Sequence, residues 1–157
     1  MLGIMSNTYT QIHIQIVFAP QYRAALIDKG WKEELHKYIT GVVQHNKHKM
    51  IIINSMADHV HVFIGMRPHQ SLSDLLQDVK GNSSRWINEQ RFTKGKFAWQ
   101  EGYGAFSYSY SHIQNVINYI ANQEVHHKKK TFIDEYRSFL AKFQVKYDER
   151  YILREPE

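Results

Sequence analysis

Two short runs of β-branched and other apolar residues near the middle of the chain constrain its fold most strongly. They span Met50–Met56 and Val60–Met66, and only Ala57, Asp58 and His59 separate them. A connection this short joins two strands as an antiparallel hairpin, because a parallel crossover needs about a dozen residues or more. We therefore predict an antiparallel sheet that contains this hairpin.

Periodic patterns on either side of the hairpin predict helices and further strands. Tyr9–Phe18 alternates apolar and polar residues, as a half-buried strand does, and Pro20 ends it because proline cannot donate to the ladder. Helices are expected where apolar residues recur at helical spacing. The predicted helices are Leu26–His48, Ser71–Phe92, Ser111–His127 and Phe132–Phe143, and the predicted last strand lies within Phe97–Tyr110.

The resulting order of elements, β-α-β-β-α-β-α, predicts an α+β fold. Its helices would pack on an antiparallel β-sheet in an arrangement close to the split β-α-β motif, which is ferredoxin-like or RRM-like. The length of 157 residues suits one domain, and with only 8 Gly and 3 Pro no stretch has the composition of a linker. We therefore predict a single domain over residues 1–157.

The composition excludes several classes of protein. The chain has no Cys, which excludes a disulfide framework and a thiolate metal site, so a metal would need His, carboxylate, amide oxygen or water as ligands. No apolar run approaches the roughly 18 residues of a membrane span, and Met1–Tyr9 lacks the pattern of a signal peptide. We expect a soluble cytoplasmic protein, and the net charge of +5 weakly favours an acidic partner such as nucleic acid.

A pair of histidines at the start of the second hairpin strand is the first candidate functional site. His59 and His61 are two residues apart, so both imidazoles project from one face of the strand while Val60 faces the core. Imidazole is the commonest side-chain ligand of divalent metals. Two half-exposed histidines without a ligand are an equally good interpretation of this pair when it is taken alone.

A tyrosine and a glutamine in the third predicted helix offer a nucleophile and a further ligand. Tyr119 and Gln123 are four residues apart, so they share a helix face that can lie across the histidine-bearing sheet surface. A Tyr hydroxyl has a usual pKa of about 10 and needs assistance to attack a phosphate. The Gln123 amide oxygen suits a hard cation such as Mg²⁺ or Mn²⁺. On the spacing alone, packing in the core is the better interpretation of Tyr119.

Taken together and in order, these motifs resemble the HUH single-tyrosine transposases, the TnpA-type enzymes of the smallest bacterial insertion sequences. A His-hydrophobic-His strand is followed about sixty residues later by Tyr-x-x-x-Gln, and the resemblance covers almost the whole chain. The segments that carry it are 17–23 (VFAPQYR), 58–63 (DHVHVF), 80–86 (KGNSSRW), 99–103 (WQEGY), 119–127 (YIANQEVHH) and 132–136 (FIDEY).

This resemblance implies an HUH endonuclease fold, a reaction and its partners. Tyr119 would attack a DNA phosphate to form a 5′-phosphotyrosine and release a 3′-OH, while His59, His61 and Gln123 would hold a divalent metal, Mg²⁺ or Mn²⁺. The 3′-OH of another cleaved end would then resolve the link without an external energy source. The substrate would be single-stranded insertion-sequence ends that bear hairpins. The protein would be a homodimer, in which the Tyr helix of one subunit can complete the site of the other.

Basic residues elsewhere in the chain are candidates for DNA contacts. Arg23 follows the first strand, and Lys80 and Arg85 lie on the helix face opposite the leucines. His126–Lys130 would either grip phosphates or act as cations at a helix C-terminus, and the second role is favoured. Asp58 has two possible roles, orienting an imidazole or shaping the hairpin turn, and the turn fits better.

Three other functions stay open. A domesticated relative would nick or only bind DNA hairpins at chromosomal repeats, a binding module would use the same fold without cleavage, and a hydrolytic metal enzyme would use water in place of Tyr119. A pure binder has no need of the complete set of His59, His61, Tyr119 and Gln123. We therefore predict a metal-dependent transposase that cleaves and rejoins single-stranded DNA.

Overall fold

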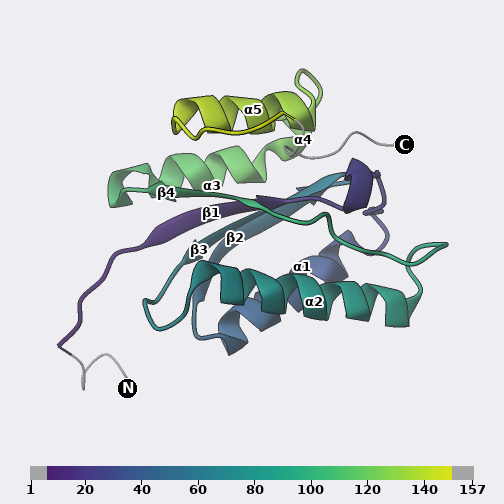
Figure 1. Cartoon of the computed structure of the whole chain (residues 1–157), viewed down its shortest axis with the longest axis horizontal. Helices are drawn as coiled ribbons and strands as arrows, with labels where there is room; N and C mark the ends of the chain where they lie inside the picture. Colours follow the sequence, from purple (N-terminus) through teal and green to yellow (C-terminus); the bar gives the residue numbers. More distant parts are fainter. Residues whose placement is uncertain (1–6, 150–157) are drawn as a thin grey trace.

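A computed structural model of the chain describes residues 7–149. Four strands form one antiparallel sheet in the order β2-β3-β1-β4, and helices cover both of its faces (Figure 1). The strands are β1 His13–Phe18, β2 Lys49–Met56, β3 His59–Gly65 and β4 Gly104–Tyr108. With α1 (Lys32–His45) between β1 and β2, and α2 (Leu72–Gln90) between β3 and β4, this is the predicted split β-α-β arrangement. The predicted α+β fold class is confirmed.

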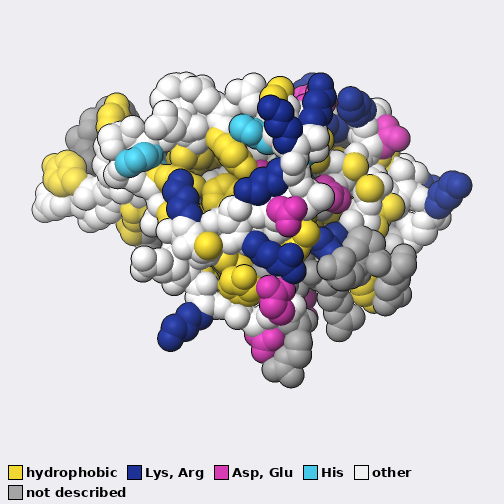
Figure 2. All heavy atoms as spheres, turned by 90° about the horizontal axis from the view of Figure 1, so that it is seen from above, with side chains coloured by type: hydrophobic (Ala, Val, Ile, Leu, Met, Phe, Trp, Pro, Cys, Tyr) yellow, Lys and Arg dark blue, Asp and Glu magenta, His cyan; other side chains and the backbone are white. Residues whose placement is uncertain are grey.

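The sheet is the middle of three layers. The helices α1 and α2 pack on one face, and α3 (Ile113–Ala121), α4 (Gln123–His126) and α5 (Phe132–Lys142) lie over the other (Figure 1). Short 3-10 turns, η2 at Gln21–Arg23 and η3 at Tyr110–His112, follow β1 and precede α3. Viewed from the α5 side, this second helical layer carries many Lys and Arg side chains (Figure 2).

Alternation along β3 sends its side chains into both helical layers. Val60 and Val62 are buried in the core that the sheet forms with α1 and α2. Phe63 is buried on the other side against α3, and its partners in alternation, His59 and His61, share that face. The predicted orientation of the histidine pair, with Val60 in the core, is therefore confirmed.

Several predicted elements are longer than those observed. The strand predicted from Tyr9 begins at His13, and the helix predicted from Leu26 begins at Lys32. The chain before α1 is irregular, and there Ile27 donates a backbone hydrogen bond to Ala57 in the hairpin turn. Only Gly104–Tyr108 of the predicted last strand is strand, whereas the helices predicted from Ser71 and Phe132 are confirmed within two residues at each end.

The helix predicted over Ser111–His127 is interrupted at Asn122. Asn122 has φ −101° and ψ 28°, and its side chain donates back to the Asn118 carbonyl, so α3 ends there and Gln123 begins the separate helix α4. Asparagine favours such breaks because its amide competes for backbone hydrogen bonds. Tyr119 and Gln123 therefore belong to different helices, contrary to prediction.

No helix within residues 7–149 has the length and apolarity that crossing a membrane requires. The sequence predicts no signal peptide in Met1–Tyr9, but residues 1–6 of this segment lie outside the described residues. Residues 150–157 lie outside them as well. A single domain over residues 1–157 therefore stays a prediction.

Gly104 allows β4 to approach α5 closely. A Cβ atom there would lie 2.8 Å from the hydroxyl oxygen of Tyr136, a buried side chain that holds α5 on the sheet. We expect Gly104→Ala to lower the free energy of unfolding by about 1–3 kcal/mol, because the ring must shift. Urea unfolding followed by circular dichroism measures the change.

The matched control for this substitution is Gly41→Ala. Gly41 lies inside α1, where a Cβ would meet no other atom, so Ala should raise the stability by about 0.5–1 kcal/mol through its better helix propensity. If both variants changed the free energy of unfolding alike, close contact between β4 and α5 at Gly104 would be refuted.

Candidate active site

Strand β3 places two histidines on the sheet face that α3, α4 and α5 cover. His59 and His61 are both 0% exposed, and the centroids of their rings lie 5.1 Å apart in an edge-to-face arrangement. The interpretation of two half-exposed histidines is therefore wrong. Buried imidazoles require polar partners to offset the loss of water, and each ring has them at both nitrogens.

Each imidazole is oriented through its Nδ1 atom. Nδ1 of His59 lies 2.7 Å from Oδ1 of Asp58, so Asp58 does more than shape the hairpin turn. Nδ1 of His61 lies 2.9 Å from the amide nitrogen of Gln15 on β1, and the amide oxygen of Gln15 accepts a hydrogen bond from Tyr108. Because each Nδ1 is engaged, both Nε2 atoms face Glu135. Asp58 accepts from Nδ1 of His59, as the outer partner of a metal-binding histidine does. The Gln15 amide instead donates to Nδ1 of His61, so Nε2 of His61 carries the proton that Glu135 accepts.

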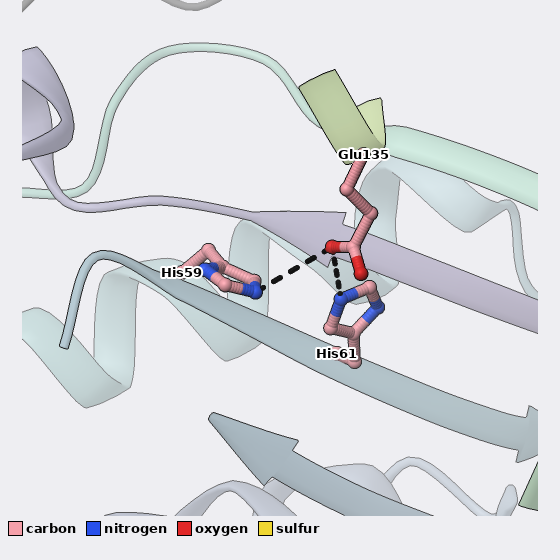
Figure 3. Close-up of side chains that lie close together, drawn as sticks. All are labelled: His59, His61 and Glu135. Carbon is pink, nitrogen blue, oxygen red and sulfur yellow. Dashed lines mark hydrogen bonds and ion pairs between the residues drawn. The ribbon is translucent and has the colours of Figure 1, made fainter. Parts of the chain in front are cut away.

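A carboxylate absent from the predicted ligand set completes this cluster. Glu135 on α5 is 2% exposed, and its Oε1 lies 2.9 Å from Nε2 of His61 and 3.6 Å from Nε2 of His59 (Figure 3). Burial alone would raise the pKa of the Glu135 carboxyl, but hydrogen bonds from His127 and His61 lower this pKa well below its usual range. Glu135 is therefore ionised at neutral pH.

The sequence carries a signal for this buried carboxylate. Glu135 lies in the apolar stripe of α5, among the buried residues Phe132, Tyr136 and Phe139. A charged residue is buried in such a stripe only where a cation, a metal or hydrogen-bond donors compensate its charge. The apolar spacing of the helix therefore points to a polar partner for Glu135 but cannot identify it.

The predicted tyrosine and glutamine both reach the cluster. The Tyr119 hydroxyl donates a hydrogen bond to Oε2 of Glu135, and its ring lies 6.2 Å from the ring of His61. Gln123 is fully buried, with Oε1 3.1 Å from Nε2 of His59. Burial, reinforced by the bond to Glu135, raises the pKa of Tyr119 well above its usual value, so the hydroxyl keeps its proton. Tyr119 is thus not simply a core aromatic.

Two histidines of the basic segment 126–130 also belong to the site. Nε2 of His127 lies 3.2 Å from Oε2 of Glu135 and 3.1 Å from Oε1 of Gln123. Burial lowers the pKa of His127, but the Glu135 carboxylate outweighs this effect and raises it. The ring of His126 stacks on Tyr119 at 4.5 Å. The segment is therefore more than the set of helix C-terminal cations that was favoured from the sequence.

The three predicted DNA-contact residues are not part of this cluster. On α2, Lys80 donates to the backbone oxygens of Gln100 and Gly102 at 2.7 Å each, and Arg85 is exposed. Arg23 in η2 is buried, with 8% exposure. Since α2 covers the opposite face of the sheet, Lys80 and Arg85 lie across the sheet from Tyr119 (Figure 1). DNA binding by these three residues stays a prediction.

The donor set fits a divalent metal. The ligating atoms of His59, His61 and Glu135 all lie within 4.8 Å of one another, and the Gln123 oxygen adjoins them. Two neighbouring ligand atoms that each lie about 2.1 Å from one ion are about 3 Å from each other. This is close to the 2.9 Å between Nε2 of His61 and Oε1 of Glu135, and to the 3.1 Å between Nε2 of His59 and Oε1 of Gln123. The cluster therefore has the composition and spacing to bind a metal.

Comparison with known proteins places the chain in a family. Residues 8–123 match the family model described as "Transposase IS200 like". A candidate transposase from Deinococcus radiodurans R1 has a similar structure, with a TM-score of 0.62 and 20% identity over 75% of this chain and 95% of the other. A search of curated proteins found no match.

A REP-associated tyrosine transposase, solved bound to a REP hairpin, is also similar, with a TM-score of 0.59 and 13% identity over 78% of this chain and 72% of the other. At these identities the structural likenesses show the fold alone. The family match is broader evidence, because it includes β3 with both histidines and continues to Gln123. The chain therefore belongs to the IS200-like transposase family.

Proposed function

We propose that this chain cleaves and rejoins single-stranded DNA at insertion-sequence ends through a covalent tyrosine intermediate. One observation carries the proposal: the Tyr119 hydroxyl, the Glu135 carboxylate and the imidazoles of His59 and His61 meet in one buried cluster. Phosphoryl transfer needs a positioned nucleophile and compensation of the phosphate charge. Membership of a transposase family supports a DNA substrate.

In the proposed reaction, the oxygen of Tyr119 attacks the scissile phosphorus. Its proton passes to Oε2 of Glu135, which already accepts the hydrogen bond from this hydroxyl. The bond between phosphorus and O3′ breaks, which leaves a 5′-phosphotyrosine, and O3′ takes up a proton from water. In the second step the 3′-OH of another end attacks the phosphotyrosine and gives its proton back to the solvent, while the bond between phosphorus and the Tyr119 oxygen breaks and that oxygen regains its proton from Glu135. The number of phosphoester bonds is unchanged, so no external energy source is needed.

His59, His61, Glu135 and Gln123 would hold the divalent metal, for which we propose Mg²⁺ or Mn²⁺. When bound, such an ion acts as a Lewis acid that stabilises the charge on the phosphate oxygens. Asp58 orients the ring of His59 for this purpose. His127, whose pKa is raised by Glu135, lies 3.2 Å from Oε2 of this carboxylate.

The proposed substrate is single-stranded DNA with a hairpin. A relative of the same fold was solved bound to a REP hairpin, and the net charge of +5 suits a nucleic acid partner. A homodimer stays a prediction. Tyr119 reaches the histidines of its own chain through Glu135, so we propose that each site is complete within one chain.

A domesticated enzyme that acts on hairpins at chromosomal repeats is the second candidate function. The likeness to the REP-associated tyrosine transposase favours it. The chemistry at Tyr119 would be the same for both functions. Insertion-sequence ends on both sides of the gene would indicate a mobile element. Hairpin repeats that are dispersed through the genome, with no such ends beside the gene, would indicate the domesticated role.

The test is a search for the covalent intermediate. Labelled single-stranded oligonucleotides, tiled across both flanks of the gene, are incubated with the protein and Mg²⁺ or Mn²⁺. We expect a protein–DNA adduct that survives denaturation in detergent and disappears with EDTA. Cleavage without an adduct would make water the nucleophile, and binding without cleavage would make the protein a binding module.

Asp58 provides a prediction about the metal. We expect Asp58→Asn to weaken Mn²⁺ binding by about 10–100-fold, because an amide is a weaker acceptor than a carboxylate for the Nδ1–H of His59. Isothermal titration calorimetry measures the affinity. Asp78→Asn, a change at an exposed position of α2, is the control and should leave it unaltered. Unaltered affinity in Asp58→Asn would restrict Asp58 to the hairpin turn.

A further inference from the structure

A cavity beside Tyr119 has no role in the chemistry proposed above. It has a volume of about 390 Å³, and Tyr119 and Glu135 contribute to its wall. Val116 of α3, Phe139 of α5 and Tyr108 of β4 also line it. Because Tyr119 lines both the cavity and the cluster, a group bound in the cavity adjoins the nucleophile.

The rim of the cavity is polar and positively charged. Lys130 lies just before α5 and donates to the Ser138 hydroxyl at 2.7 Å. Lys142 lies at the end of α5, with its Nζ 5.8 Å from the centroid of the Tyr108 ring. His112 and Asn115 on the α3 side are exposed and complete the rim. On this face, Lys and Arg side chains lie beside apolar patches (Figure 2).

We infer that this cavity binds one unstacked nucleotide of the single-stranded DNA, the nucleotide next to the scissile phosphate. The inference rests on the proposed function. Proteins hold single strands by combining aromatic and apolar surfaces for the bases with cations for the backbone, and both occur here. The volume lies within the range of about 300–1,000 Å³ for small-molecule sites, which a single nucleotide can occupy.

The occupant follows from the position of the cavity and from its charge. With a phosphate at the Tyr119 hydroxyl, the adjoining sugar and base lie at the cavity, and Lys130 and Lys142 are placed for the flanking phosphate groups. A base inside a duplex is paired and stacked, so it must leave the stack to enter such a cavity. The cavity therefore favours single-stranded over double-stranded DNA at the cleavage point.

The first test removes bases one at a time from the oligonucleotide that forms the adduct. An abasic nucleotide beside the scissile phosphate should slow adduct formation by about 5- to 150-fold, the effect of losing one stacked base. Ser138→Trp, which fills the cavity from its exposed rim, should slow the reaction similarly on the intact strand and have little further effect on the abasic strand. Ala141→Trp, at an exposed position of α5 outside the cavity, should leave both rates unchanged.

The second test needs no cleavage. In the Tyr119→Phe protein, which cannot form the adduct, 2-aminopurine is placed at each position of the tiled oligonucleotide that binds most tightly. We expect the 2-aminopurine fluorescence to be strongly quenched at one position of the strand. This quenching should be lost in the double variant that combines Tyr119→Phe with Ser138→Trp. Equal fluorescence at every position, or an adduct rate that no abasic nucleotide lowers, would overturn the inference. If the wild-type protein formed no adduct while Tyr119→Phe still showed position-specific quenching, the proposed chemistry would be refuted and the nucleotide site would stand.

Discussion

The Tyr119→Phe protein should bind single-stranded DNA as the wild type does and form no covalent adduct. The substitution removes only the attacking oxygen, so the rate should fall by a factor that approaches the order of 10⁶ observed when an enzyme loses its nucleophile. The ring keeps its stacking on His126 and its edge-to-face contact with Phe139. Adduct yield on denaturing gels, together with a DNA-binding titration, separates loss of chemistry from loss of binding.

Tyr110→Phe is the matched control for this result. Tyr110 is 73% exposed in η3 and makes no contact with the cluster, so its hydroxyl should be dispensable. If Tyr119→Phe still formed the adduct, the nucleophile would be another group. Tyr108 would then be tested next, because it lines the same cavity and hydrogen-bonds to Gln15.

Replacing Glu135 by Gln should cause the second largest loss. The variant keeps the shape of the side chain but removes the charge that compensates a metal and accepts the proton of Tyr119. We expect the affinity for Mn²⁺ to fall by more than the roughly 100-fold that marks loss of an outer partner, because Glu135 would contact the ion itself. Adduct formation should be lost at Mn²⁺ concentrations that saturate the wild type.

Two further variants make this experiment specific. Glu124→Gln removes an exposed carboxylate that pairs only weakly with Lys29 at 3.6 Å, so it should leave the metal affinity unchanged. Gln123→Ala should weaken the binding of Mn²⁺ less than Glu135→Gln does, since it removes a neutral ligand. Unchanged affinity in Glu135→Gln would leave His59, His61 and Gln123 as the ligand set, as the sequence predicts.

The fold was predictable because short-range rules determine it. The short connection in the hairpin, predicted as three residues and observed as the two residues Ala57 and Asp58, requires antiparallel pairing. The i, i+2 spacing of His59 and His61 places both rings on one face of β3. The same kind of rule failed at Asn122, where the side chain competes for the helix hydrogen bonds. Helical spacing over Ser111–His127 does not reveal such a local break.

The rest of the candidate site depends on tertiary contacts. Glu135 meets His61 across 74 positions of the chain, and no rule based on spacing predicts how α5 docks on the sheet. His127 was assigned to a helix C-terminus because its sequence neighbours are lysines, whereas its position is determined by the turn between α4 and α5. The family resemblance provided Tyr119 and Gln123, but the carboxylate required the three-dimensional structure.

The contribution of α5 to the cluster links the site to the order of protein synthesis. Glu135 is translated 74 residues after His61. At a synthesis rate of about 5–20 residues per second, Glu135 is added to the nascent chain roughly 4–15 s after His61. Until α5 has docked on β4, Tyr119 also lacks the group that accepts its hydrogen bond. A ribosome-bound chain thus carries an unfinished cluster, and the proposed capacity to break DNA would appear only after α5 has folded.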